Sequence, residues 1–357
     1  MAVPLHFDLP NDLKHLDVEF FDPRQAPFSI HGLYHPEEGP YFRRCPDAVA
    51  KATNEWVADL YRNTAGGRIR FTTDSPYILI HVEWPACTFS DNMGMLGESS
   101  FDLYEDLPEG SRYHTTFRMP PDPRDEKLQK GFDSVVYAAD SAKKSYTLHM
   151  PLYNHVDSVY IGLKPGSVLE PERPYLPIKP VLYYGSSITQ GGSASRPGMA
   201  YENIISRELN VDHINMGFSG SCRGEDSMVS YLLTLDVSVF VSDYDHNAPN
   251  PEHLDRTLRR MIGRFRDKKP ELPIIMVSKP DFRAEREEDV RRREVVRSVY
   301  EEAVRAGAKN IQFVDGSTLF PAPYQRDCTI DGCHPNDLGL RGMANGIGAA
   351  VRRALGL

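Results

Sequence analysis

The pattern of hydrophobic and polar positions divides the chain into two halves. From residue 1 to about residue 172, short stretches rich in Val, Ile, Tyr, Phe and Thr alternate with Gly, Pro, Asp and Asn. Many short strands joined by polar turns, with almost no helical periodicity, predict a β-sandwich or jelly roll. In one of these stretches, Arg68 and Arg70 alternate with Ile69 and Phe71, which indicates a strand with one solvated face. The predicted strands cover residues 28–34, 68–73, 77–84, 100–104, 113–117, 134–137, 145–150 and 156–162.

Residues 164–180 contain five prolines and several charges, which disfavour both a helix and pairing in a sheet. We therefore predict a linker there, with an all-β domain at 1–172 and a second domain at 173–357.

After the linker, apolar strands alternate with helical patterns. Five short apolar strands separated by helices predict a parallel sheet covered on both faces. The charged run at 286–297 mixes both signs and is expected to be a solvated helix face. The predicted strands are 181–184, 213–216, 237–242, 274–278 and 311–314, and the predicted helices are 201–209, 251–266, 284–306 and 337–355.

The composition adds constraints on partners and location. Hydrophobic content of 40% and charged content of 25% are typical of a globular protein in water, and the net charge of −9 argues against nucleic acid or an anionic membrane as a partner. No apolar run is long enough to span a bilayer. Residues 1–8 lack a basic segment followed by an apolar one, so we expect no secretion signal and a cytoplasmic location.

The five cysteines are scattered and form no C-x-x-C motif. Free thiols in a reducing compartment are the simplest interpretation. Cys328, Cys333 and His334 are close in sequence, but no fourth ligand stands at a familiar metal-binding spacing. We expect neither a metal nor an organic cofactor.

The most distinctive stretch is a strand that breaks at Gly185-Ser186-Ser187. Such a turn lifts one side chain out of the sheet and directs backbone N–H groups toward the same space. We hypothesise that Ser187 is a nucleophile, although the turn alone does not choose between the two serines. A serine nucleophile requires a base to take its proton, and Asp331 and His334 stand three residues apart in a Gly- and Pro-containing loop. On this spacing alone, they are equally well a turn former and a surface histidine.

An oxyanion would need donors, and candidates follow the predicted strands. They are the N–H groups of Ser187 and Gly220 and the side-chain amide of Asn247. Each by itself is more often a turn residue, but together they stand at successive strand ends, where sites of parallel sheets lie. A rival nucleophile is Cys222, because Gly220-Ser-Cys222-Arg-Gly224 has the spacing of a nucleophile elbow.

Taken in order, Gly185-Ser-Ser-Ile188, Gly220, Asn247 and Asp331-x-x-His334 resemble the four blocks of the SGNH/GDSL hydrolase superfamily. Residues 195–200 resemble the Ser-Arg-Pro-Gly-Met-Ala stretch of one esterase subgroup. In addition, residues 100–104 resemble the Gly-x-Asp-Leu-Tyr marker of its N-terminal β-sandwich.

This resemblance implies a flavodoxin-like three-layer α/β/α domain, preceded by the all-β domain, that catalyses ester hydrolysis or acyl transfer. It implies Ser187 as nucleophile, His334 as base and Asp331 as its orienting partner. It also implies oxyanion donors at Ser187, Gly220 and Asn247. Two departures from the family pattern are Ser186, where Asp is usual, and the third block, where Asp245-His246 precede Asn247 and Ala248 follows it.

The substrate is less defined. In such enzymes an attached β-sandwich suggests a carbohydrate substrate, so we expect a short-chain acyl ester, O-acetyl first, on a carbohydrate, either a small molecule or an oligosaccharide. Arg196, His246 and Tyr153 are candidate substrate-binding residues; the alternatives are a structural loop arginine, a solvated loop histidine and a core aromatic. An acyltransferase with the same triad and an inactive carbohydrate-binding protein remain the alternative functions.

Overall fold

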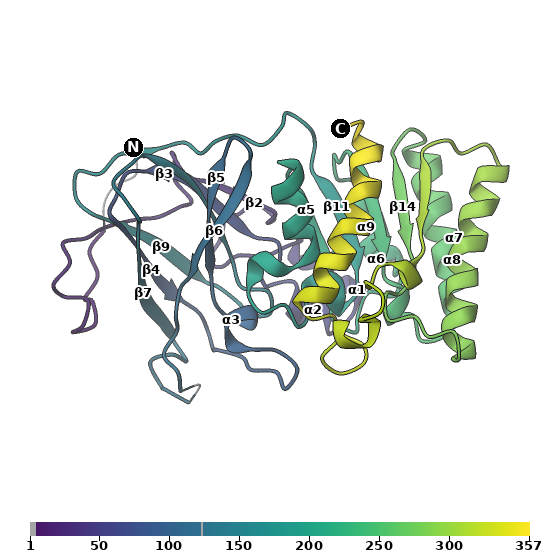
Figure 1. Cartoon of the computed structure of the whole chain (residues 1–357), viewed down its shortest axis with the longest axis horizontal. Helices are drawn as coiled ribbons and strands as arrows, with labels where there is room; N and C mark the ends of the chain where they lie inside the picture. The colour runs from purple at the N-terminus through teal and green to yellow at the C-terminus, as the bar shows by residue number, and fades with distance from the viewer. Residues whose placement is uncertain (1–4, 123) are drawn as a thin grey trace. The chain divides into compact units, whose positions relative to one another are not determined.

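The computed structural model describes residues 5–122 and 124–357, and it divides the chain into two compact units (Figure 1). The first unit contains residues up to Arg44, Arg62–Tyr175 and Ser195–Gly198. The second unit contains Cys45–Tyr61, Leu176–Ala194 and Met199–Leu357. Each unit therefore takes a short segment from the other's part of the sequence.

The first unit is built on two antiparallel sheets that share one hydrophobic core. Ile78, Ile80 and Ile161 of one sheet and Phe71 and Leu148 of the other belong to the same buried cluster. The first sheet has the order β1 (Glu19–Phe21), β9 (Ser158–Leu163), β4 (Tyr77–Glu83) and β7 (Gly131–Tyr137). The second has the order β10 (Leu169–Glu170), β3 (Arg68–Thr73), β8 (Lys144–His149), β5 (Asp102–Leu107) and β6 (Gly110–Thr116), with β2 (Ser29–His31) also paired to β3.

The solvated face predicted for strand β3 is wrong. Both Arg68 and Arg70 are almost completely buried. The guanidinium of Arg70 donates to Asp106 and to the hydroxyl of Thr147, and it lies 3.9 Å from the ring centroid of Tyr175. A buried arginine is tolerated where a carboxylate and hydrogen bonds compensate its desolvation, and these partners come from strands that the sequence pattern could not pair.

The predicted linker at 164–180 also contains a short strand. Leu169 and Glu170 form β10 and pair antiparallel with Thr73 and Thr72 at the edge of the second sheet. The prolines flank this pair and do not interrupt it, which is consistent with proline at the edges of sheets.

Helices α1 (Asp47–Thr53) and α2 (Val57–Leu60) form within the part of the chain that was predicted to be all β. Their apolar side chains, including Ala50 and Val57, belong to the core of the second unit. The side-chain amide of Asn54 donates to Glu225 in that unit. Both helices are short and α1 buries only Ala50, so neither produces a readable helical stripe. A third short helix, α3 (Met95–Glu98), lies in the first unit.

The second unit contains the predicted parallel sheet. Its strand order is β12 (His213–Gly217), β11 (Val181–Gly185), β13 (Val239–Asp243), β14 (Ile274–Val277) and β15 (Ile311–Val314). Numbered within the unit this order is 2-1-3-4-5, the order of flavodoxin-like sheets. The first strand of the unit is therefore central, between β12 and β13, and the register aligns Gly185 with Gly217 and Asp243.

Helices cover both faces of this sheet. Leu182 and Tyr184 point into a core shared with helices α6 (Asp226–Leu232), α7 (Pro251–Lys268) and α8 (Glu287–Arg305). Tyr183, on the opposite face, packs edge-on against Tyr201 of α5 (Tyr201–Leu209), which lies beside α9 (Asp337–Leu355) (Figure 1). The remaining short elements are α4 (Ser187–Gln190) and the 3₁₀ turns Pro197–Met199, Asp245–Asn247, Gly316–Thr318 and Gln325–Cys328.

The solvated face predicted at 286–297 needs correction, because Asp289 and Arg292 are both buried. Arg292 of α8 is buried, and its guanidinium donates to the backbone oxygens of Asp245 and Ala248. This arginine therefore ties helix α8 to the loop that follows β13. Within the described residues, no helix is long and apolar enough to cross a membrane.

Candidate active site

The strand–turn–helix at Ser187 begins the site. Strand β11 ends at Gly185, Ser186 caps the short helix α4 by accepting a hydrogen bond from the N–H of Ile188, and Ser187 is the first helical residue. Gly185 is required by packing, since a Cβ there would lie 2.0 Å from Oγ1 of Thr189. The Ser187 side chain thus stands at the carboxyl end of the central strand.

The loop before helix α9 carries the other two predicted residues. Its ends are joined by a bridge between Thr329 and Pro335 and by a hydrogen bond from the Ile330 N–H to the His334 oxygen. Inside the loop, one oxygen of Asp331 accepts the backbone N–H groups of Cys333 at 2.9 Å and His334 at 2.7 Å. The loop backbone therefore fixes how the Asp331 carboxylate is turned.

The structure brings Ser187, His334 and Asp331 together in one line of contacts. Nε2 of His334 is 2.9 Å from Oγ of Ser187, and Nδ1 of His334 is 2.6 Å from the second carboxylate oxygen of Asp331. Burial alone would raise the pKa of Asp331, but the hydrogen bonds and charge of His334 lower it below the usual value. An ionised carboxylate at Nδ1 favours the tautomer whose Nε2 accepts a proton.

Two further loops converge on the same edge of the sheet. The turn after β12 is held to the Ser187 turn by the Phe218 N–H, which donates to the Gly185 oxygen at 3.0 Å. The side-chain amide of Asn247 donates to the Phe218 oxygen at 2.9 Å. Gly220 has a φ of 65°, a conformation that glycine adopts at little cost. The structure therefore assembles the predicted residues of the first three blocks around adjacent strand ends.

Buried polar side chains form hydrogen bonds to Thr189, two residues after Ser187, and they were not predicted from the sequence. The Asp243 carboxylate accepts hydrogen bonds from the hydroxyls of Thr189 and Tyr201, each at 3.1 Å. Burial raises the pKa of Asp243 to about 7, although these bonds and the charge of His246 oppose the shift. The side-chain amide of Asn215 donates to the backbone oxygen of Thr189 at 2.7 Å. Asn215 lies next to the end of the predicted strand 213–216, and Asp243 directly follows the predicted strand 237–242, so their positions were the available signal.

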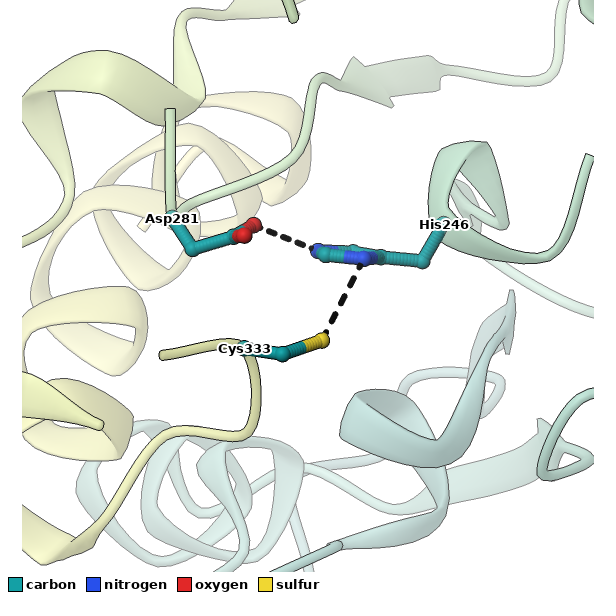
Figure 2. A group of neighbouring side chains, drawn as sticks. All are labelled: His246, Asp281 and Cys333. Carbon is teal, nitrogen blue, oxygen red and sulfur yellow. Dashed lines mark hydrogen bonds and ion pairs between the residues drawn. The ribbon is translucent and has the colours of Figure 1, made fainter. Parts of the chain in front are cut away.

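His246 does not lie in a solvated loop. Its side chain is only 12% exposed, Nε2 is 2.9 Å from Asp281, and Nδ1 is 3.8 Å from Sγ of Cys333 (Figure 2). Asp281 follows strand β14 and was missed, although the strand-end rule that selected Asn247 applies to it equally.

The other two candidate substrate residues belong to the first unit. Arg196 donates to the Asp102 carboxylate at 2.7 Å and to the Tyr104 hydroxyl, and its guanidinium lies 3.9 Å from the ring centroid of Tyr113. Asp102 and Tyr104 are the Asp and Tyr of the Asp-Leu-Tyr marker, and Asp102 also accepts the N–H of Gly198. Tyr153 is partly buried, and its backbone N–H donates to the backbone oxygen of Glu98. Substrate binding by Arg196 and Tyr153 stays a prediction.

The rival chemistries find less support. Cys222 is 1% exposed and its thiol donates to the Met216 oxygen, so a substrate would not reach it. Cys328 is completely buried, with its thiol directed at the Tyr324 oxygen. Within the described residues, no disulfide joins any of the five cysteines.

Comparison with known proteins places this chain in a family. Residues 178–352 match the model of the GDSL-like lipase/acylhydrolase family. Residues 18–169 match the GxDLY model, described as the N-terminus of Esterase_SGNH_hydro-type. The chain belongs to the SGNH/GDSL hydrolase superfamily. As a member, it is an enzyme of the esterase type.

Solved structures similar to this SGNH hydrolase extend over almost its whole length. A protein described as a GDSL-like lipase from Bacteroides ovatus is 27% identical, with a TM-score of 0.84 over 95% of this chain and 98% of that one. A salicylyl-acyltransferase from a tetracycline biosynthetic pathway is 17% identical, with a TM-score of 0.74 over 95% and 97%. An acetyl xylan esterase from the rumen bacterium Butyrivibrio proteoclasticus is 11% identical, with a TM-score of 0.59 over 95% and 99%. No curated protein matches the chain.

One departure from the SGNH pattern has a simple structural reading. Ser186 stands where Asp is usual, and its side chain caps helix α4. Serine and aspartate are both preferred at helix N-caps, so the substitution preserves the local hydrogen bond.

Proposed function

We propose that this SGNH hydrolase is a serine esterase in which Ser187, His334 and Asp331 form the catalytic triad. The observation that carries the proposal is a pair of hydrogen-bond distances. They are 2.9 Å from Oγ of Ser187 to Nε2 of His334 and 2.6 Å from Nδ1 of His334 to the Asp331 carboxylate. Nucleophile, base and orienting carboxylate in hydrogen-bond reach are the geometric signature of acyl transfer through a serine.

The reaction proceeds in two steps. Nε2 of His334 takes the Ser187 proton while Oγ attacks the ester carbonyl, and the resulting imidazolium is stabilised by Asp331. The leaving alcohol takes the proton from the imidazolium as the ester bond breaks, which leaves an acyl-serine. Water then attacks the acyl-serine with His334 again as base, and the free acid leaves.

The tetrahedral intermediate requires donors for its oxyanion, and we assign them to the N–H groups of Ser187 and Gly220 and the amide of Asn247. Within the described part of the chain, the Gly220 N–H donates no recorded hydrogen bond, so it is available to an oxyanion. Asn247 has one amide hydrogen engaged by the Phe218 oxygen, which orients the other. Preorganised donors of this kind typically contribute about 10²–10³-fold in rate each.

For the substrate we propose a short-chain acyl ester, O-acetyl first, on a carbohydrate. The acetyl xylan esterase with a similar fold supports this choice, and the support is at the level of the fold. We also propose that the two sheets of the first unit form the β-sandwich, of jelly-roll type, that accompanies such esterases. Their shared hydrophobic core is the supporting observation.

A second candidate is an acyltransferase that uses the same triad, with an alcohol or amine in place of water. The similarity in fold to the salicylyl-acyltransferase supports this second candidate. Product analysis separates the two: added acceptor raises total turnover and lowers the yield of free acid in a transferase, whereas free acid stays the main product of a hydrolase.

The test compares the two adjacent serines. Ser187→Ala should reduce hydrolysis of an aryl acetate by at least about 10³-fold, as loss of a catalytic nucleophile does. Ser186→Ala removes only a helix cap, so it should lower stability by about 1 kcal/mol and keep turnover within about threefold. Labelling of Ser187 by a fluorophosphonate would identify the reactive serine. A panel of acetylated sugars would then define the substrate. An active Ser187→Ala variant would refute the assignment.

A further inference from the structure

Beside the proposed triad lies a second group of titratable side chains, His246, Asp281 and Cys333. Figure 2 shows Asp281 and Cys333 both directed at the ring of His246, Asp281 at Nε2 and Cys333 at Nδ1. The distances are 2.9 Å from Nε2 to the carboxylate and 3.8 Å from Nδ1 to Sγ. The order of groups, carboxylate then imidazole then thiol, is the order found in enzymes with an activated cysteine.

We propose that Cys333 is a reactive thiol, activated by the His246–Asp281 pair, and that its oxidation by hydroperoxides or its alkylation inactivates the enzyme.

Charge around the ring favours an imidazolium. Burial by itself lowers the pKa of His246, but the hydrogen bonds and charges of Asp281 and Cys333 raise it to about 10. Burial would raise the pKa of Asp281, yet His246 and Lys279 lower it to about 2. A cationic ring beside a thiol is the kind of electropositive surrounding in which reactive cysteines are found.

Accessibility separates Cys333 from the other cysteines. Cys45, Cys87, Cys222 and Cys328 are all buried, whereas Cys333 is partly exposed. A cavity of about 360 Å³ is lined by Asp281 and by Gly332, the residue before Cys333. Small reagents can therefore approach this segment of the loop.

The three side chains could in principle hold a metal ion, since their ligand atoms lie within 4.8 Å of one another. The neighbouring charge argues against it. The ammonium group of Lys279 is 3.3 Å from the Asp281 carboxylate and 2.8 Å from that of Asp289, so a cation already occupies this side of the group. In addition, Nε2 of His246 faces Asp281, which leaves a single ring nitrogen for a metal.

Modification of Cys333 would reach the proposed triad through the backbone. Cys333 directly precedes His334, and its N–H donates to the same Asp331 oxygen that accepts the His334 N–H. Added atoms on Sγ must displace either the partly buried His246 ring or the loop. Because the loop is the more exposed of the two, we expect it to move and to carry His334 away from Ser187. This consequence for activity rests on the proposed function, whereas the reactivity of the thiol does not.

With hydrogen peroxide, the step balances within the group. The Cys333 thiolate attacks one peroxide oxygen, an S–O bond forms and the O–O bond breaks. The sulfur is oxidised by two electrons to a sulfenic acid, Cys–S–OH, and the peroxide is reduced. The departing hydroxide takes the proton of the His246 imidazolium and leaves as water. With iodoacetamide, an S–C bond forms and iodide leaves.

The experiment measures thiol labelling and activity on the same sample. Full-length protein is treated with iodoacetamide at neutral pH. The alkylation rate of each cysteine is followed by peptide mass spectrometry, and aryl-acetate hydrolysis is followed in parallel. The same labelling is repeated on wild type unfolded in urea. The variants are Cys333→Ser, Cys328→Ser as the buried-cysteine control, and His246→Gln.

We expect Cys333 to react at least about tenfold faster in the folded than in the unfolded protein, and activity to fall at the rate of its labelling. Cys333→Ser should keep its own starting activity throughout the treatment, whereas Cys328→Ser should be inactivated like wild type. His246→Gln should slow the labelling of Cys333 by about tenfold. Peroxide should inactivate wild type reversibly, with a dithiol restoring activity.

Three results would overturn parts of the proposal in distinguishable ways. Equal labelling of Cys333 in folded and unfolded wild type refutes activation, and this comparison needs no variant to fold. Complete labelling without loss of activity refutes control of the triad. Labelling that becomes fast only after a chelator is added refutes the free thiolate in favour of a metal site. A protein without esterase activity but with a fast-reacting Cys333 would refute the proposed function and leave the reactive thiol standing.

Discussion

The Asp331→Asn substitution tests the proposed triad at a side chain whose orientation is fixed by hydrogen bonds from the loop backbone. One Asp331 oxygen accepts two backbone N–H groups, so in the asparagine variant the amide oxygen must take that position. The amide nitrogen then faces Nδ1 of His334, where the second carboxylate oxygen now stands at 2.6 Å. An amide NH₂ only donates, so Nδ1 has to lose its proton and Nε2 has to carry it. A protonated, neutral Nε2 cannot accept the Ser187 proton.

The magnitude follows from this tautomer. A triad held fully in the wrong tautomer loses about 10⁴-fold in kcat. The Asp331 side chain is 36% exposed, so water competes for Nδ1 and recovers part of the loss. We expect kcat to fall about 10³-fold, equivalent to about 4 kcal/mol of transition-state stabilisation.

The assay is steady-state hydrolysis of an aryl acetate, with thermal unfolding measured alongside. Because the asparagine keeps both loop hydrogen bonds, its melting temperature should stay near that of wild type. Asp331→Ala is the matched comparison: it removes the loop bonds but leaves water free to accept from Nδ1, so it should retain more activity than the asparagine. An asparagine variant more active than the alanine variant would show that loop support, and not tautomer control, is the role of Asp331.

Three further predictions concern the support of the site. Asp243, whose pKa burial raises to about 7 from an ordinary 3.8, binds a proton in the folded state that the unfolded chain releases, so its contribution to stability falls as pH rises from about 4 to about 7. Asp243→Asn should abolish this loss, up to about 4 kcal/mol, in urea unfolding measured across that range. Gly185→Ala should destabilise the protein by about 3 kcal/mol, because its Cβ would lie 2.0 Å from Oγ1 of Thr189 and 2.7 Å from the backbone oxygen of Asp243. Arg292→Lys should reduce kcat by about tenfold, since one ammonium cannot reproduce the guanidinium's bonds to both ends of the 245–248 loop that carries Asn247.

The chain supplies matched controls for these predictions. Gly263→Ala, in helix α7 with no atom within 4 Å of its Cβ, should stabilise by about 1 kcal/mol, and a loss as large as that of Gly185→Ala would contradict the steric argument. Arg291→Lys, an exposed neighbour of Arg292, should leave kcat near that of wild type and change stability by less than about 0.5 kcal/mol. For Asp243, parallel pH profiles of wild type and the asparagine variant would contradict the assigned proton.

The five strands and the four longest helices in the second half of the chain could be read from the sequence, whereas the shorter helix α6 (Asp226–Leu232) was not predicted. The helices predicted at 201–209 and 337–355 have those bounds in the structure, and Asn336 caps the second of them. Hydrophobic periodicity and end signals are local, and in a parallel sheet they coincide with the fold because every strand is buried on both faces. The same locality made Ser187, Asp331 and His334 candidates, since each lies in a short motif at a strand end or in a loop, and the resemblance to the SGNH/GDSL blocks selected them.

What the sequence left open are pairings between distant segments. Arg68 and Arg70 look solvated in a period-two pattern, and only the neighbouring strands supply the carboxylate and hydroxyl that make burial of Arg70 tolerable. Helices α1 and α2 stand in the β-rich half of the sequence, yet their apolar residues join the core of the second unit. A short helix acquires its burial from the surface it packs on, which no local pattern contains.

The surroundings of His246 show the same division most clearly. Its place after a buried strand was evident from the sequence, and the same rule could have found Asp281, but the two are separated by a helix and a strand. Only the parallel alignment of β13 and β14 brings their loops together, and only the closing loop before α9 adds Cys333. The sequence determined which chemical groups stand at the strand ends. The tertiary structure decided which of them meet, because charge interactions that shift a pKa act over a few ångströms of space and not along the chain.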